Sequence, residues 1–248
     1  MIRWLSIAAA LGALGALAVQ ASKGGLLPAL VACALALLPV RIEPSARAIA
    51  ACAAVLALAA STGALWQAAM GAALLALALG LPWLPWLVPA GERGLLGEVP
   101  PLPTLAAGGI TPVALVGWLL AAQPDLRDAT ALVPDLPLPV LLLGAAGFTL
   151  VNATLEEVLW RGLFQPHLAA LLGPALAIVV QAVSFGAQHA HGVPRGAIGM
   201  ALAGGWAVLL GALRHRSGGL LAPLLAHFVA DATIALMLLW LSQRAGEL

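Results

Sequence analysis

The sequence predicts an all-α protein, a polytopic transmembrane helix bundle of about eight helices, from its composition and from its long apolar runs. Hydrophobic residues make up 62% of the 248-residue chain and charged residues only 8%, whereas a soluble domain carries about 25% charged residues. The mean hydropathy is +1.05. Because so few charged side chains cannot cover a water-exposed surface, we expect a lipid bilayer to cover most of it.

Several apolar segments approach the roughly 20 residues that a helix needs to cross a bilayer. They are residues 4–21, 26–40, 47–63, 65–89, 111–123, 136–171, 174–191, 197–213 and 219–241. Segment 26–40 is short, and segment 111–123 is short enough to lie at the interface or to re-enter the membrane, so we expect about eight crossings. The first segment resembles a signal peptide, but further apolar segments follow at once, which favours an anchor helix that is retained.

The two halves of the chain differ in where their ionisable residues lie. The glycines and prolines of residues 90–110 predict an irregular loop. We expect N-terminal transmembrane helices and this connecting loop in residues 1–110, and a second helix bundle that contains the functional groups in residues 111–248, because every ionisable group deep inside an apolar segment lies in the second part. No internal repeat marks the pseudo-symmetric halves of a transporter.

Net charge and cysteine content exclude several function classes. A formal net charge of +1 gives no electrostatic basis for binding nucleic acid. Cys33 and Cys52 both lie in apolar runs and are expected as free thiols. The sequence contains no His-Glu-x-x-His zinc motif, no Gly-x-Ser-x-Gly elbow and no phosphate-binding loop.

The first polar motif lies within segment 136–171. A charged side chain at bilayer depth costs about 2.5–3.5 kcal/mol on insertion scales, yet Glu156 and Glu157 are adjacent here. On a helix, Glu157 and Arg161 are i,i+4 neighbours and can form an ion pair, while Glu156 shares a face with Asn152 and is left available as a general base. The alternative is an interfacial ion cluster at a helix end.

The second and third motifs place histidines on the following apolar segments. Phe185 and His189 are four residues apart, and His189 is as far after the turn at Gly173 as Glu157 is before it, so an antiparallel helix pair puts both at similar depth. His227 and Asp231 form another i,i+4 pair, in which the carboxylate would orient the imidazole. The alternative for this pair is a self-satisfied contact that only joins two helices.

These three motifs, in this order and on apolar helices, resemble the CPBP family of CAAX proteases and bacteriocin-processing enzymes, also called the ABI family. The family pattern is Glu-Glu-x-x-x-Arg, then Phe-x-x-x-His, then His-x-x-x-Asn or Asp. The resemblance covers about residues 145–241 and rests on Glu156, Glu157, Arg161, Phe185, His189, His227 and Asp231. Family members are multi-spanning intramembrane endopeptidases.

The resemblance implies a role for each catalytic residue. Glu156 would activate a water molecule with help from His189, and His227 and Asp231 would bind the oxyanion or position the water. Aspartate at 231 replaces the commoner asparagine, and an ionised carboxylate cannot donate a hydrogen bond, so Asp231 would act in its protonated form or through His227.

The remaining motif residues would support the site. Glu157, Arg161, Phe185 and Asn152 would hold it together, and Trp160 stands where the family usually has Phe. We favour a metal-free glutamate mechanism with no cofactor. The alternative is a Zn²⁺ ion, for which Glu156, His189 and His227 would be the ligands.

The function that the sequence predicts is hydrolysis of a peptide bond near the C-terminus or membrane anchor of a protein or peptide substrate. Expected partners are membrane lipids and a substrate with a hydrophobic or C-terminal membrane-associated segment, with no nucleic acid. The Ala-, Leu- and Gly-rich composition favours a bacterial inner (cytoplasmic) membrane. The rivals are a non-catalytic protein of the same family, acting in bacteriocin immunity or as a scaffold, and a proton-coupled transporter.

Overall fold

The computed structural model describes residues 2–23, 26–37, 42–61, 70–71, 73–74 and 96–245. Within these ranges the chain is helical and contains no strand, which confirms the all-α fold class. Six of the described helices are long and apolar enough to cross a membrane. The predicted span 65–89 and the first residues of the predicted loop 90–110 lie largely outside the described ranges.

Three helices form the N-terminal group: α1 (Ile2–Lys23), α2 (Leu27–Ala36) and α3 (Pro44–Ser61). They pack against one another through alanines that are fully buried. Small side chains let helix backbones approach closely. In a bilayer this close packing drives helix association, because lipid tails are as apolar as the side chains and burying them against protein brings no hydrophobic gain. Ser6 ties the group together, because its hydroxyl donates to the Ile2 carbonyl at 2.9 Å and accepts from the Glu43 amide at 2.8 Å.

Helix α5 (Pro101–Ala122) corrects the prediction of an irregular loop over residues 90–110 and of a short segment at 111–123. Its prolines do not break it, because Pro101 and Pro103 fall in the first turn, where backbone amides have no helical partner. Pro112 lies inside the helix. The helix ends at Gln123, which adopts a left-handed conformation with φ of 42°.

The rest of the chain contains the three motifs. A long helical run is formed by α7 (Leu138–Glu157), a π-helical stretch η2 (Val158–Phe164) and α8 (Gln165–Leu172). The run continues past Pro166, which directly follows the π-helical stretch, where the Gln165 amide bonds to the Trp160 carbonyl. It is preceded by the short α6 (Arg127–Thr130) and followed by α9 (Pro174–Gln188), α10 (Gly196–Ser217) and α11 (Leu221–Ala245).

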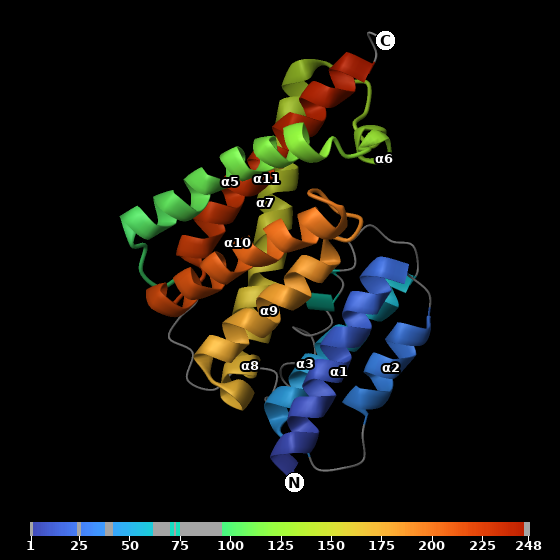
Figure 1. Ribbon diagram of the computed structural model, residues 1–248, viewed down its shortest axis with the longest axis vertical. Helices are drawn as coiled ribbons and strands as arrows, with labels where there is room; N and C mark the ends of the chain where they lie inside the picture. Colours follow the sequence, from blue (N-terminus) through green and yellow to red (C-terminus); the bar gives the residue numbers. More distant parts are fainter. Residues whose placement is uncertain are drawn as a thin grey trace.

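In Figure 1, α5, α11, α10 and α9 follow one another down the molecule and are crossed by the steeper α7, while α1 to α3 lie to one side. Helix α11 contacts α5 and α7, α10 contacts α9 and α5, and the N-terminal group joins the rest through contacts of α1 with α9 and of α3 with α8. One buried cluster runs from the alanines of α1 to α3 into Trp160, Phe164 and Phe185. The parts of the chain that carry the first two motifs, η2 and α9, are therefore packed against the N-terminal helices by a continuous core.

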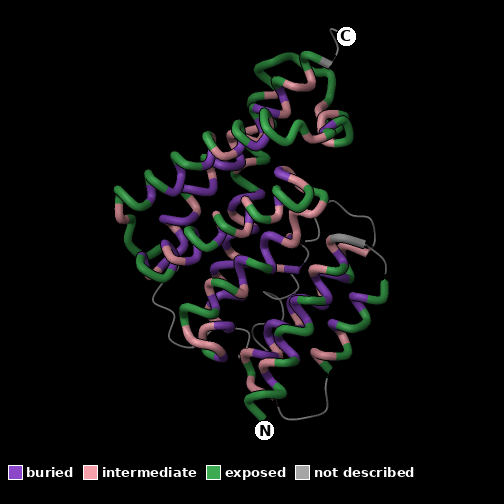
Figure 2. The backbone as a smooth tube through the Cα atoms, viewed as in Figure 1, coloured by how far each residue is buried: buried purple, intermediate pink, exposed green. Residues whose placement is uncertain are grey.

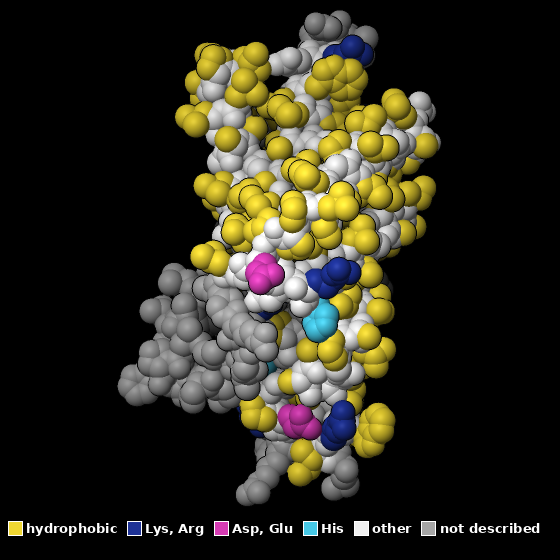
Figure 3. Space-filling model, turned by 90° about the vertical axis from the view of Figure 1, so that its left-hand side faces the viewer, with side chains coloured by type: hydrophobic (Ala, Val, Ile, Leu, Met, Phe, Trp, Pro, Cys, Tyr) yellow, Lys and Arg dark blue, Asp and Glu magenta, His cyan; other side chains and the backbone are white. Residues whose placement is uncertain are grey.

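The outer surface is apolar, as expected for a protein in a bilayer. Buried residues gather where helices meet and exposed ones run along the outer sides (Figure 2). On the face seen in Figure 3, hydrophobic side chains dominate and charged ones form only small groups. Together with the span lengths, this surface identifies an integral, multi-pass membrane protein.

Candidate active site

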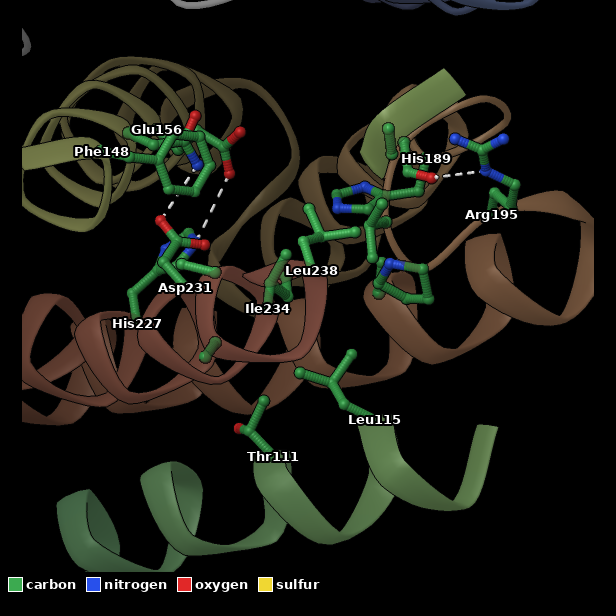
Figure 4. A pocket seen from close by; sticks show the side chains of 18 of the residues that line it. Thr111, Leu115, Phe148, Glu156, His189, Arg195, His227, Asp231, Ile234 and Leu238 are labelled. Atoms are coloured by element: carbon green, nitrogen blue, oxygen red, sulfur yellow. Dashed lines mark hydrogen bonds and ion pairs between the residues drawn. The ribbon is translucent and has the colours of Figure 1, made fainter. Parts of the chain in front are cut away.

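A cavity of about 1070 Å³ opens among α5, α6, α7, α10, α11 and the connection between α9 and α10. Most of its lining is apolar. Figure 4 shows Glu156 of α7 opposite His227 and Asp231 of α11, with His189 and Arg195 farther along the cavity. The three sequence motifs therefore meet: Glu156, His189, His227 and Asp231 all line this cavity.

The predicted ion pair between Glu157 and Arg161 is present and buried. Arg161 Nη1 donates to Glu157 Oε1 at 2.9 Å, and the two side chains are 0% and 1% exposed. The same carboxylate oxygen lies 2.6 Å from His227 Nδ1. Glu157 thus receives hydrogen bonds from α11 and from its own helix, and it fixes the ring of His227.

Glu156 faces the cavity with its neighbours at longer range. Its Oε2 lies 3.5 Å from His227 Nε2 in an arrangement too long for a strong hydrogen bond. The side chain is buried yet lines the cavity. A carboxylate in this position is free to contact a water molecule or a substrate group.

Asp231 contacts a different residue from the one that its spacing predicted. Its Oδ1 is 3.7 Å from His227 Nε2, beyond hydrogen-bond range, while its Oδ2 accepts from Asn152 Nδ2 at 3.0 Å. The expectation that a hydrogen bond to Asp231 orients the imidazole is wrong in this geometry, because Glu157 holds Nδ1 at 2.6 Å while Asp231 stays 3.7 Å from Nε2. Asn152 joins the site through Asp231.

His189 lies one residue beyond the end of α9, and its Nδ1 is 3.2 Å from the Phe185 carbonyl. A carbonyl can only accept, so Nδ1 carries the hydrogen and Nε2 of the neutral ring is an acceptor. Among the described residues, no hydrogen bond or ion pair joins His189 to Glu156. The two can cooperate only across a water molecule or a substrate.

Phe185 occupies the centre of the polar cluster. Its ring centroid is 4.9 Å from that of His189 and 6.2 Å from that of His227. The guanidinium carbon of Arg161 lies 4.7 Å above the same ring, a cation–π contact that is strongest when the cation is desolvated. The aromatic ring therefore sets the spacing between the two histidines and the arginine.

Two features of the site have no signal in the sequence. Trp206 of α10 packs edge-on against His227 with centroids 4.9 Å apart, and its Nε1 donates to the Ala107 carbonyl of α5 at 3.3 Å. Arg195 pairs with Asp128 at 2.7 Å where both line the cavity, and this hydrogen bond holds the pKa of Asp128 below its ordinary value. Neither belongs to a motif, and only tertiary packing brings them here.

The alternative zinc ligands can be compared with this geometry. Within the described part of the chain, no group of three or more His, Cys, Asp or Glu side chains is arranged to hold a metal ion. Glu156, His189 and His227 line one cavity without converging on a common point as zinc ligands must. In this arrangement the three side chains do not fit a zinc ion.

Comparison with known proteins bears on the same segment. Residues 138–233 match the family described as type II CAAX prenyl endopeptidase Rce1-like. No curated protein and no solved structure matches the chain. The matched segment contains all three motifs, so the resemblance to the CPBP family is confirmed there, and at the level of the family it supports a CAAX-type intramembrane protease.

Proposed function

We propose that this chain, whose residues 138–233 match the Rce1-like family, hydrolyses a peptide bond near the C-terminus or membrane anchor of a protein or peptide substrate. The observation that carries the proposal is the placement of Glu156 and His227, 3.5 Å apart, on the wall of a large apolar cavity. An acid–base pair beside an apolar binding site suits a substrate that arrives within the bilayer.

The cavity is the substrate site in this proposal. Its apolar walls, with Leu115, Ile234 and Leu238 among them, would hold a hydrophobic or membrane-associated segment in an extended form (Figure 4). A hydrophobic substrate segment that moves from lipid into this cavity stays in apolar surroundings, so binding does not expose it to water. The substrate's scissile carbonyl would lie between Glu156 and His227.

Glu156 is the general base. Its carboxylate removes a proton from a water molecule, the resulting hydroxide adds to the scissile carbonyl carbon, and the carbon–nitrogen bond then breaks. The proton held on Glu156 passes to the departing amine, which returns the carboxylate to its starting state. His189 offers its Nε2 acceptor from the other side of the cavity to position the water.

His227 stabilises the oxyanion. Because Glu157 accepts from Nδ1 at 2.6 Å, a protonated His227 directs its remaining hydrogen, on Nε2, towards the space beside Glu156. A cationic donor held in a water-poor site stabilises developing negative charge strongly. Asp231 acts through His227, because its Oδ1 lies 3.7 Å from Nε2. Asn152 keeps the Asp231 carboxylate in place by donating a hydrogen bond to Oδ2.

The mechanism needs no cofactor in this proposal, and the protein works in a bacterial cytoplasmic membrane with lipids and a protein substrate as partners. A non-catalytic role, as an immunity factor or scaffold, and zinc-dependent hydrolysis are the competing functions. They predict different results in one assay.

The assay is cleavage of peptides with a hydrophobic C-terminal segment by the protein in liposomes, with products mapped by mass spectrometry. Glu156→Gln should lower the rate at least about 10²–10⁴-fold, the usual contribution of a general base, and Glu98→Gln, an exposed carboxylate outside the cavity, should not. A zinc chelator should leave the wild-type rate unchanged. Equal rates in wild type and Glu156→Gln would contradict the mechanism, and loss with chelator would favour zinc.

A further inference from the structure

A second, smaller cavity lies beside Arg161 and is separate from the catalytic one. Its volume is about 100 Å³, roughly three times the ~30 Å³ that a water molecule occupies in the liquid. It is too small for a peptide and large enough for a small ion. It is lined by Arg161, Gln165, Pro166, Ala169, Pro174, Arg214 and His215.

Arg161 has unused donors. Its Nη1 binds Glu157, but Nε and Nη2 are buried and have no hydrogen-bond partner. These two nitrogens form the side edge of the guanidinium, whose parallel N–H groups bind carboxylate or phosphate oxygens in pairs. Phe185 covers the face of the guanidinium and leaves this edge to hydrogen bonding. A buried arginine with an unsatisfied edge calls for an oxygen acceptor.

The surroundings of the cavity favour negative charge. Helix α9 begins at Pro174, so the cavity borders the N-terminus of a 15-residue helix, where amides lack partners and the helix dipole is positive. Arg214, which is buried, and His215, which is exposed, add further basic groups. Among the described residues that line the cavity, none is acidic.

Gln165 narrows the chemistry of the ligand. Its Nε2 donates to the Gly211 carbonyl at 2.9 Å, and its Oε1 is a buried acceptor without a hydrogen-bond partner. An acceptor beside several cationic donors suits an oxyanion that keeps one hydroxyl. Inorganic phosphate keeps a hydroxyl near neutral pH, and a phosphate monoester keeps one in its monoanionic form, which is populated around and below its second pKa of about 6.

The cavity lies at a basic end of the bundle. Arg3 Nη2 donates to the Leu171 carbonyl at 3.3 Å, just before the turn from α8 to α9, and Arg214 and His215 fall in the last turn of α10. Basic residues at helix ends mark the cytoplasmic side of a membrane protein and attract anionic lipid. A lipid headgroup at the membrane surface would therefore lie close to this cavity.

We propose that this cavity binds a phosphate-class oxyanion, from a phosphomonoester lipid headgroup or from free phosphate, between the Nε–Nη2 edge of Arg161, Arg214 and the N-terminus of α9. The other edge of the same guanidinium holds Glu157, which holds His227. The bound anion thus fixes the arginine that supports the catalytic site. Binding is independent of peptide hydrolysis and is tested without it.

The test is thermal unfolding of the full-length protein in detergent, with inorganic phosphate against sodium chloride at equal ionic strength. At phosphate ten times its Kd, the midpoint should rise by about 3–6 °C. Ala169→Leu fills the cavity and should abolish the rise, whereas Ala170→Leu, at an exposed neighbouring position outside it, should retain it. Each variant's midpoint in chloride verifies that it folds.

A charge pair of variants and a lipid arm complete the experiment. Arg214→Gln should lose the rise and Arg216→Gln, which is exposed and outside the cavity, should keep it. Short-chain phosphatidic acid, compared with short-chain phosphatidylcholine, identifies a lipid source if it stabilises the protein and phosphate does not. The proposal is overturned if neither phosphate nor phosphatidic acid raises the midpoint, or if Ala169→Leu responds as Ala170→Leu does.

Discussion

The hydrogen bonds of Glu157 predict that Glu157→Gln destabilises the protein strongly. Glutamine keeps the size of the side chain but removes the charge that faces Arg161, a guanidinium with 0% exposure. Removing one partner of a buried ion pair costs about 3–5 kcal/mol. For chains of 150–250 residues, each kcal/mol shifts the unfolding midpoint by about 2–4 °C, so the midpoint should fall by roughly 6–20 °C.

Thermal unfolding in one detergent measures this shift, with Glu98→Gln as the control for loss of an exposed carboxylate. The double variant Glu157→Leu with Arg161→Met removes both charges and should recover most of the lost stability, because an apolar replacement leaves no buried charge unpaired. A fall of less than about 2 °C in Glu157→Gln would refute the reasoning. So would a double variant as unstable as the sum of its two single variants.

Three further predictions follow from contacts in and beside the cavity. Asn152→Asp puts a second carboxylate where an amide lies 3.0 Å from Asp231, so kcat/KM should fall at least about tenfold. Adding Asp231→Asn should restore most of the lost activity. A double variant no more active than Asn152→Asp alone would contradict the proposed contact between residues 152 and 231. Phe185→Leu removes the ring beneath the buried guanidinium and should cost about 1–3 kcal/mol in thermal unfolding, whereas an unchanged midpoint would contradict the contact. Asp128→Asn should lower the free energy of unfolding by less than about 1 kcal/mol. Because Arg195 lowers the pKa of Asp128, the ion pair stabilises the fold above the ordinary aspartate pKa, and the difference in stability between variant and wild type should vanish as pH falls through the lowered pKa. A difference in stability that does not change with pH would exclude the ion pair as its origin.

The convergence of the motifs could be predicted from the sequence because charge is expensive in apolar surroundings. Glu157 and Arg161 are i,i+4 neighbours, and helix geometry alone brings them together. The polar side chains of residues 189, 227 and 231 lie in apolar helices, where few polar partners are available apart from one another and the first motif, so they are expected to share one site. The outcome, one cavity lined by all three motifs, follows from that constraint.

The partners across helices could not be predicted in the same way. The contact of Glu157 with His227 depends on how α11 packs against α7, and local spacing carries no information about that packing. Trp206 lies in an apolar helix where nothing distinguishes its contact with His227 from ordinary packing. Helix α5 was missed because Pro101 and Pro103 suggest a loop, although at the start of a helix they are well tolerated.

The most direct test of Glu156 as the base is rescue of Glu156→Ala by formate in the liposome cleavage assay. The truncated side chain leaves space beside His227 that a small carboxylate can enter. We expect almost no cleavage without formate and a saturable rise with it, with acetamide, which is uncharged, giving none. Cleavage by Glu156→Ala at the wild-type rate without formate would contradict the role of Glu156 in hydrolysis.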